Sequence, residues 1–260
     1  MTSTQAWLVA LGVAVGAMSV LWLISARLRN ASIIDPAWGP AFLLLSIVYL
    51  ITSPEGADPV RSRLVLGAVA LWSLRLGLHL VARSIGKPED PRYRAMRDRN
   101  GPRWWLQSLF AVFWLQALLA TVISVPLMVA IRSQAPPVWL DGLATIVFLA
   151  GLGIETVADW QLQRFRKNSE LRGTVLDSGL WRYSRHPNYF GEALLWWGFW
   201  LFALPAGGVW TVFAPLLMTW LLTRVSGVPL LEAQLVETRP GYAEYLERTS
   251  SFIPWPPRRS

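Results

Sequence analysis

One short segment concentrates the residues best suited to bind a charged ligand. It reads Gly179-Leu-Trp-Arg-Tyr-Ser-Arg-His-Pro-Asn-Tyr-Phe-Gly-Glu192, and its functional candidates are Arg182, Tyr183, Arg185, His186, Asn188, Tyr189 and Glu192. Pro187 is typical of a helix N-terminus, where free N–H groups and the helix dipole favour an anion. Asn188 and Glu192 share a helix face, so they can hold a carboxamide or sugar hydroxyls. A basic loop on anionic lipid headgroups would explain the arginines, but not this amide and carboxylate.

Two further segments carry polar residues at helical spacing. Glu155, Asp159 and Arg166 follow i, i+4, i+11, which places them on one face of a helix. Alternatively, these polar residues could mark the solvated end of the helix. That interpretation explains Glu155 poorly, because Glu155 lies at membrane depth. Near the C-terminus, Arg224 and Glu232 precede a predicted helix, turn and return segment. That segment either closes over a ligand site or anchors the chain at the membrane surface.

Asp35 is the candidate acid within an apolar run. It lies beside a Pro-x-x-Gly-Pro pattern, and the next apolar run carries Trp72, Arg75 and His79 on one face. Two interpretations stay open: a buried Asp35–Arg75 ion pair, or a membrane-embedded carboxylic acid that donates a proton or hydrogen bond.

The elements that position these residues are predicted to be membrane-spanning helices. Hydrophobic residues make up 53% of the 260 residues and charged residues 15%, against about 25% charged in soluble proteins. Charge-free runs long enough to span a bilayer cover Met1–Ala26, Pro36–Pro54, Trp104–Ile131 and Ala193–Thr223. We therefore expect an all-α polytopic membrane protein of about seven transmembrane helices. The predicted spans are 5–26, 34–53, 63–82, 104–131, 139–160, 189–204 and 209–226, with a turn at Leu204–Gly208 separating the last two.

The lysines and arginines predict the orientation. Of the 24, two lie in the first loop, seven in the third, six in the fifth and five in the tail, whereas the even loops hold three. The positive-inside rule then puts the N-terminus outside and the C-terminus in the cytoplasm. We expect a single transmembrane domain over 1–260, in which loops 84–103 and 161–187 and tail 228–260 form the cytoplasmic side.

Composition also excludes several function classes. The chain has no cysteine and two histidines, which excludes disulfides and thiolate metal sites and disfavours a histidine-rich metal centre. The net charge of +8 is explained by the cytoplasmic loops, and without a basic soluble domain no nucleic-acid partner is predicted. Membrane lipids are the expected surroundings, and no obligate protein partner is evident.

Taken together, these segments resemble a known family. Ser184–Glu192 followed by Trp196-Trp-Gly198 is similar to the signature of the steroid 5α-reductase superfamily. Asn30–Gly39, Trp72–Arg75, Glu89-Asp-Pro-Arg-Tyr93 and Asp159–Arg166 resemble its bacterial 5α-reductase-like branch. The resemblance implies a protein with a seven-helix fold in the bacterial cytoplasmic membrane. Such a protein would reduce a carbon–carbon double bond conjugated to a carbonyl in a lipid. Its cofactor, NADPH, would enter from the cytosol.

The resemblance also assigns roles to residues. It implies that Asp35 and Trp72 are the catalytic pair on the substrate side. The cofactor-binding residues it implies are Asp159, Arg166, Asn188, Glu192 and Arg224. We also expect cofactor contacts from Tyr183, Arg185 and His186 of the Arg-His-Pro segment and from Glu232, where the steroid-converting members carry a tyrosine. The steroid-converting members carry Gln-Glu where this chain has Ile34-Asp35, a tyrosine at the nearest match to Trp72, and an asparagine at Glu155.

Two other functions are weighed against the reductase. Isoprenylcysteine carboxyl methyltransferases, which use S-adenosylmethionine, resemble the chain through Arg-Tyr-x-Arg-His-Pro and through Glu232 ahead of Gly241–Tyr245. A non-enzymatic lipid-binding or transport protein would use the buried charges to line a pathway. The abundance of arginine in loops three and five favours a cofactor with a 2′-phosphate, NADPH. The expected partner is a lipophilic enone substrate.

Overall fold

In the computed structural model, the chain is described at all residues except 172, 226–231, 233–234 and 259–260. Every regular element of the described part is helical, as expected. Six segments there are long and apolar enough to cross a membrane: Ser3–Leu28, Ala31–Ile51, Pro59–Ser84, Pro91–Ile123, Trp139–Lys167 and Gly208–Val225. The chain therefore has the architecture of an integral membrane protein.

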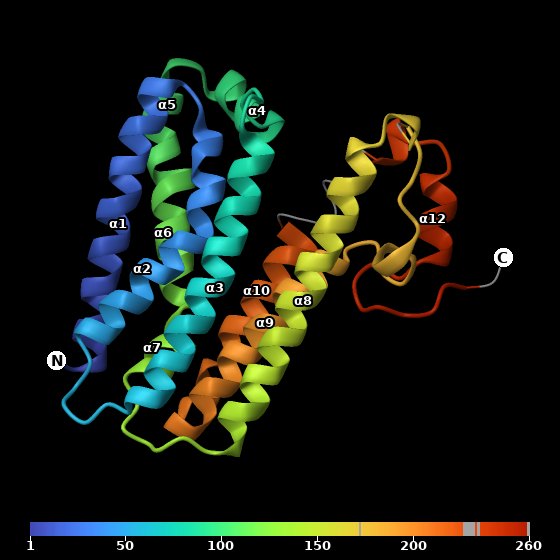
Figure 1. Ribbon diagram of the computed structural model, residues 1–260. Helices are drawn as coiled ribbons and strands as arrows, with labels where there is room; N and C mark the ends of the chain where they lie inside the picture. The colour runs from blue at the N-terminus through green and yellow to red at the C-terminus, as the bar shows by residue number, and fades with distance from the viewer. Residues whose placement is uncertain (172, 226–231, 233–234, 259–260) are drawn as a thin grey trace. The chain divides into compact units, whose positions relative to one another are not determined.

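The structure divides into two compact units. The N-terminal unit comprises Met1–Val138 with Phe202–Thr211, and the C-terminal unit comprises Trp139–Leu201 with Val212–Ser260. Figure 1 labels their helices. Each unit is described below by itself.

The N-terminal unit is a bundle of long helices. Its elements are α1 (Ser3–Leu28), η1 (Ala31–Ala37), α2 (Trp38–Ile51), α3 (Pro59–Ser84), α4 (Pro91–Asn100), η2 (Gly101–Arg103), α5 (Trp104–Ser108), η3 (Leu109–Trp114), α6 (Leu115–Ile123) and α7 (Val125–Ile131), followed by η6 (Leu204–Ala206). Helices α2 and α3 pack closely (Figure 1), because Gly39 lies against the backbone of Ser73. A Cβ on Gly39 would lie 3.0 Å from the Ser73 carbonyl oxygen.

The predicted span 104–131 is not one continuous α-helix. It is interrupted at Ser124, between α6 and α7. Pro126 explains the interruption, since its nitrogen cannot donate the helical hydrogen bond that residue 122 would accept. The Ser124 hydroxyl instead donates to the Thr121 carbonyl and contacts the Tyr49 hydroxyl.

The C-terminal unit contains α8 (Trp139–Lys167), η4 (Ser169–Leu171), η5 (Gly179–Arg182), α9 (Pro187–Ala203), α10 (Phe213–Trp220), η8 (Leu221–Val225) and α12 (Tyr242–Arg248). The division between the units falls within two elements, because the last two residues of α9 belong to the N-terminal unit and η7 (Gly208–Val212) has its last residue in the C-terminal unit. Helix α9 corresponds to the predicted span 189–204 and has 17 residues. The predicted turn before the last span is present, with Gly207 in the left-handed region at φ 75°.

Helices α8 and α9 pack backbone to backbone in antiparallel directions. A Cβ on Gly191 would lie 2.5 Å from the Glu155 nitrogen, and one on Gly151 would lie 2.5 Å from the Leu195 nitrogen. Glycine is required at both positions because any side chain would force the two helices apart. This contact places the acidic residues of α8, Glu155 and Asp159, next to the N-terminal end of α9.

Candidate functional site

The first cluster of functional groups lies in the N-terminal unit and is centred on Asp35. Asp35 is in η1, and its two carboxylate oxygens accept hydrogen bonds from residues of α4. The Tyr93 hydroxyl donates to Oδ1 at 2.7 Å, and Arg92 Nη2 donates to Oδ2 at 3.2 Å. We call these three residues the Asp35 cluster. Tyr93 is buried, whereas 27% of the Asp35 side chain is exposed. Asp35 is thus the more accessible of the two, and Tyr93 supports it from within.

A second layer of hydrogen bonds fixes η1 against the start of α4. Glu89 Oε1 accepts from the Ala31 nitrogen at 2.7 Å and from Arg97 Nη2 at 2.8 Å. The Ser32 hydroxyl accepts from the Asp90 nitrogen at 2.7 Å. These hydrogen bonds join the start of η1, which precedes Asp35, to residues 89–90, which precede Tyr93. The two segments therefore hold each other in place.

Asp90 starts α4 and fixes the direction of Arg92. Its Oδ1 accepts hydrogen bonds from both the backbone nitrogen and Nε of Arg92, each at 2.9 Å. Burial acts to raise the pKa of Asp90, but the hydrogen bonds and positive charge of Arg92 outweigh it and lower the pKa. Asp90 therefore stays ionised and holds the arginine beside Asp35.

Arg92 and Tyr93 of this cluster lie in the segment Glu89–Tyr93, for which the sequence alone predicted no functional role. Asp-Pro at 90–91 is a helix-start signal that could have placed Arg92 and Tyr93 in a first helical turn. No periodicity connects that turn to Asp35, which lies 58 residues earlier.

Trp72, expected as the partner of Asp35, is fully buried in α3. Its ring packs edge to face against Phe42, with the ring centroids 5.5 Å apart. Arg75 and His79 follow on the same helix and are half-buried. The hydroxyl that contacts Asp35 belongs to Tyr93 and not to a residue of α3.

The second cluster lies in the C-terminal unit, where α8 meets α9. Asn188 Nδ2 donates to Asp159 Oδ1 at 3.1 Å. One turn along α9, Glu192 is buried and accepts a hydrogen bond from Trp196 Nε1 at 3.2 Å. Glu155 is also buried, with its backbone at the Gly191 contact. We call Glu155, Asp159, Asn188 and Glu192 the Asn188 face. The predicted face of α8 and the predicted face of α9 are thus brought together.

The Asn188 face is not arranged as a metal centre. Within the described residues, no group of three or more histidine, aspartate or glutamate side chains is placed to hold a metal ion. The amide of Asn188 keeps its oxygen and one N–H after bonding Asp159, which suits an uncharged polar ligand.

A third group of residues binds the C-terminal segment to the N-terminal end of α9. Arg185 Nε donates to Glu232 Oε1 at 2.8 Å, and His186 Nε2 lies 3.0 Å from the same oxygen. Arg185 Nη1 also donates to the carbonyls of Leu246 and Thr249, at 2.6 and 2.9 Å. We call Arg185, His186 and Glu232 the Arg185 clamp. The guanidinium is largely used by these contacts, so the structure gives Arg185 a positioning role.

The clamp is reinforced by backbone contacts and tyrosines. The Tyr183 carbonyl accepts from the Trp255 nitrogen at 2.9 Å, and the Tyr245 hydroxyl donates to the Trp181 carbonyl. Burial acts to raise the pKa of Glu232, but its contacts with His186 and Arg185 outweigh burial and lower the pKa. Burial, together with the negative charge of Glu232, raises the pKa of Tyr242 to about 12. The predicted return segment is therefore folded back onto the Arg-His-Pro segment.

The remaining predicted cofactor contacts are exposed. Arg166 is exposed near the end of α8, Arg224 is exposed in η8, and the Tyr183 side chain is 43% exposed. Guanidinium groups exposed at the surface can reach the phosphates of a ligand.

Comparison with known proteins finds one relative and one family. The chain is 27% identical over 265 residues to an uncharacterized protein of Schizosaccharomyces pombe, an alignment that covers 91% of this chain and 76% of the yeast protein. No solved structure matches the chain. The DUF1295 family, described as a protein of unknown function, matches residues 21–249, which include all three clusters. The chain therefore belongs to DUF1295, a steroid 5-alpha-reductase-like family.

Proposed function

We propose that this protein is an NADPH-dependent membrane reductase that acts on a carbon–carbon double bond conjugated to a carbonyl in a lipid. The main support for the proposal is the hydrogen bond between Asp159 and Asn188, next to buried Glu192. Together these residues place an amide and carboxylates at the N-terminal end of α9. Arg185 and His186 of the Arg185 clamp fit the methyltransferase alternative equally well, and Glu232 fits it better, because the steroid-converting reductases carry a tyrosine at that position. Asp159, Asn188 and Glu192 of the Asn188 face fit the reductase resemblance better than the methyltransferase resemblance.

The residues of the C-terminal unit fit the proposed cofactor. Asn188 retains an amide oxygen and an N–H that match a nicotinamide carboxamide. Carboxylates of the same face match ribose hydroxyls, and exposed Arg166 and Arg224 match phosphates. NADPH, when bound, supplies the hydride for the β-carbon of the substrate.

The Asp35 cluster supplies the other requirement, a group that stabilises negative charge on the substrate carbonyl oxygen. Asp35, in its protonated form, donates a hydrogen bond or proton to that oxygen, and the buried Tyr93 hydroxyl, which donates to Oδ1, holds the Asp35 side chain in position. Charge on the oxygen grows as the β-carbon is reduced, so a fixed donor stabilises the transition state more than the substrate. The apolar surroundings expected of a membrane protein strengthen this interaction.

The proposal is tested by the thermal stability of the purified full-length protein in detergent. NADPH, NADH and S-adenosylmethionine are compared at matched concentrations, because a ligand that binds only the folded state raises its melting temperature. We expect NADPH to give the largest rise. We expect Asn188→Ala to weaken NADPH binding about tenfold, which is the usual value of a hydrogen bond to a polar ligand.

The control variant is Gln163→Ala, which removes an exposed amide from the same end of α8 and should leave binding unchanged. Arg166→Ala should weaken NADPH more than NADH if its guanidinium meets the 2′-phosphate. If only S-adenosylmethionine raised the melting temperature, the methyltransferase alternative would replace the reductase proposal. No rise with any of the three would favour a lipid-binding protein.

A further inference from the structure

A pocket of about 740 Å³ lies in the N-terminal unit, at the end of the bundle opposite to the Asp35 cluster. It is formed by the start of α1, by α7 and the loop after it, and by η6 and η7. Helix α1 separates the two ends, because its 26 residues run from the pocket to the segment before Asp35. Nothing in the proposed reduction uses this pocket.

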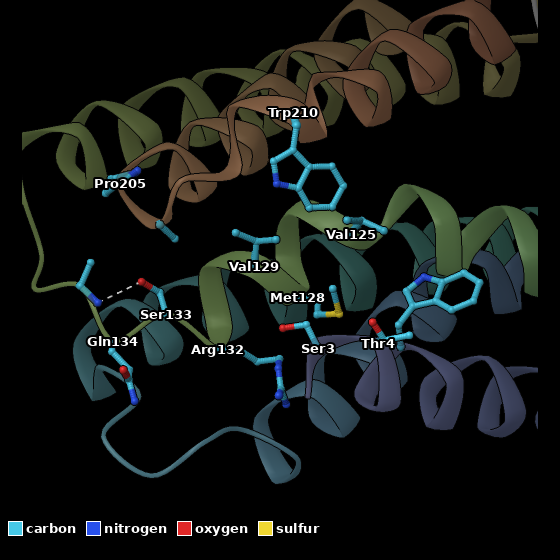
Figure 2. Close-up of a pocket in the computed structure, with 13 residues that line it drawn as sticks. Ser3, Thr4, Val125, Met128, Val129, Arg132, Ser133, Gln134, Pro205 and Trp210 are labelled. Atoms are coloured by element: carbon cyan, nitrogen blue, oxygen red, sulfur yellow. Dashed lines mark hydrogen bonds between the residues drawn. The ribbon is translucent and has the colours of Figure 1, made fainter. Parts of the chain in front are cut away.

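The pocket has a polar side and an apolar side. Figure 2 shows Trp210 on one side of the pocket and Arg132 with Ser3 on the other. Val125 and Val129 of α7 extend the apolar wall, and Trp7, one turn after Ser3 on α1, adds an indole ring to the lining; α1 is one of the helices long and apolar enough to cross a membrane. Such a pocket has the polarity of a lipid, with a headgroup at one end and hydrocarbon at the other.

Arg132 is the charged residue of the pocket, and it is 8% exposed. Its two Nη atoms donate to oxygen atoms of Thr52 and to the Met1 carbonyl. Its Nε–H, which is also buried, has no hydrogen-bond partner among the described residues. Over the same part of the chain, no carboxylate forms an ion pair with this guanidinium, and burial alone lowers its pKa.

A buried guanidinium without a counter-charge is costly. The carbonyl and hydroxyl oxygens around Arg132 carry only partial charges, so they offset that cost in part. An anion in the pocket would supply the missing negative charge and form charge-assisted hydrogen bonds, for which a guanidinium and a phosphate are well matched. Ser3 and Thr4 place hydroxyl groups beside the same space.

We propose that this pocket binds the phosphate headgroup of an anionic membrane lipid, with the phosphate at Arg132 and the lipid chains along Trp7 and Trp210. The ends of membrane-crossing helices lie at the depth of the lipid headgroups, so phosphate and pocket meet at the same level. The tryptophan rings are suited to the boundary between headgroup and hydrocarbon.

The test measures lipid binding to the full-length protein in detergent micelles, by native mass spectrometry and by thermal stability. The probes are phosphatidylglycerol, the uncharged lipid diacylglycerol, and inorganic phosphate. We expect phosphatidylglycerol to bind and to raise the melting temperature, whereas diacylglycerol and inorganic phosphate do neither. Arg132→Gln should lower the affinity for phosphatidylglycerol about tenfold or more, the value of a charge-assisted hydrogen bond.

Arg63→Gln is the matched control, because it removes an equal charge from an exposed arginine near the same end of the unit. A second pair of variants keeps the test informative if Arg132→Gln does not fold. Thr4→Phe fills the pocket from an exposed position on α1 and should block the lipid, whereas Leu8→Phe, an exposed position outside the pocket, should not.

Two results would overturn the proposal. Phosphatidylglycerol affinity that is equal in the wild type, Arg132→Gln and Thr4→Phe would show that the lipid binds elsewhere. Saturable, Arg132-dependent binding of inorganic phosphate that matches phosphatidylglycerol would assign the site to a free anion instead of a lipid.

Discussion

At the scale of single residues, the proposed chemistry depends on two pairs of side chains that join distant parts of the chain. The first pair, in the N-terminal unit, is Tyr93 with Asp35. The second pair, in the C-terminal unit, is Asn188 with Asp159. In each pair, one side chain holds the other in a fixed direction. Pre-organised polar groups of this kind are what a transition state with developing charge requires.

The Asp35 cluster yields a prediction for catalysis. Asp35→Asn should lower kcat about 100- to 1000-fold while leaving NADPH binding nearly unchanged, because an amide cannot give a proton to the substrate carbonyl as the proposed carboxylic acid does. Tyr93→Phe should lower kcat less, about tenfold, because Asp35 remains but loses its hydrogen bond. The measurement is turnover of a lipid enone with NADPH, together with the NADPH affinity of each variant.

Tyr49→Phe is the matched control for Tyr93→Phe. It also removes a buried tyrosine hydroxyl from the N-terminal unit, but one that contacts Ser124 at 2.8 Å, away from Asp35. This variant should lose stability and keep its kcat. Full activity of Asp35→Asn would show that the acid has been assigned to the wrong residue.

At the scale of elements, the close packing of α8 on α9 brings the Asn188 face together. The contact depends on glycine because backbone atoms of the opposite helix occupy the place of a side chain. Gly191→Ala should lower the free energy of unfolding by about 1–3 kcal/mol, the usual cost of overpacking, and should weaken NADPH binding. Thermal unfolding and NADPH titration measure the two effects.

Gly153→Ala provides the comparison on the same helix as Gly151. A Cβ at position 153 meets no atom within 4 Å, so this change should be neutral or should stabilise α8 by up to about 1 kcal/mol. If Gly191→Ala and Gly153→Ala had the same effect, close helix contact would not be what shapes this site.

The Arg185 clamp gives a second prediction at this scale, on pH. The pKa of Glu232 is lowered in the folded protein, so its contribution to stability is fully present above its ordinary value near 4.5. That contribution is lost as the pH falls through the lower value of the folded state. The melting temperature of the wild type should therefore exceed that of Glu232→Gln at pH 7, and the difference should shrink below about pH 4.5.

The groups facing Glu232 are Arg185, His186 and Tyr242, and the contacts with His186 and Arg185 determine the size of this effect, because Tyr242 is uncharged over this pH range. Glu247→Gln, an exposed acid on α12, is the control that should show no such difference. A constant difference between wild type and Glu232→Gln from pH 7 to pH 3 would contradict the assignment.

At the scale of the whole molecule, the loop charges predict which side of the membrane each loop faces. The chain has no cysteine, so single cysteines report without background. In intact cells, Glu55→Cys should react with a membrane-impermeant maleimide, and Lys87→Cys should react only after the membrane is opened. Both positions are exposed. The reverse pattern would invert the orientation and place the predicted cofactor side outside.

The sequence by itself determined the class of this protein and much of its candidate site. Charge-free runs predicted the membrane helices because hydrophobic length is a property of each segment alone. The 3.6-residue period likewise predicted the faces of α8 and α9, and a proline with glycines predicted the turn at Leu204–Gly208. Each of these features acts within one helix or one turn, so it can be read from neighbouring residues.

Only the tertiary structure decided which of these elements meet. Tyr93 reaches Asp35 across 58 residues, Glu232 reaches Arg185 across 47, and neither pair follows from the spacing of residues along a helix. The pairings result from the path of the loops and from the distance at which glycines let backbones approach. Those quantities depend on packing between segments, which is why the sequence predicted the groups and the fold determined their partners.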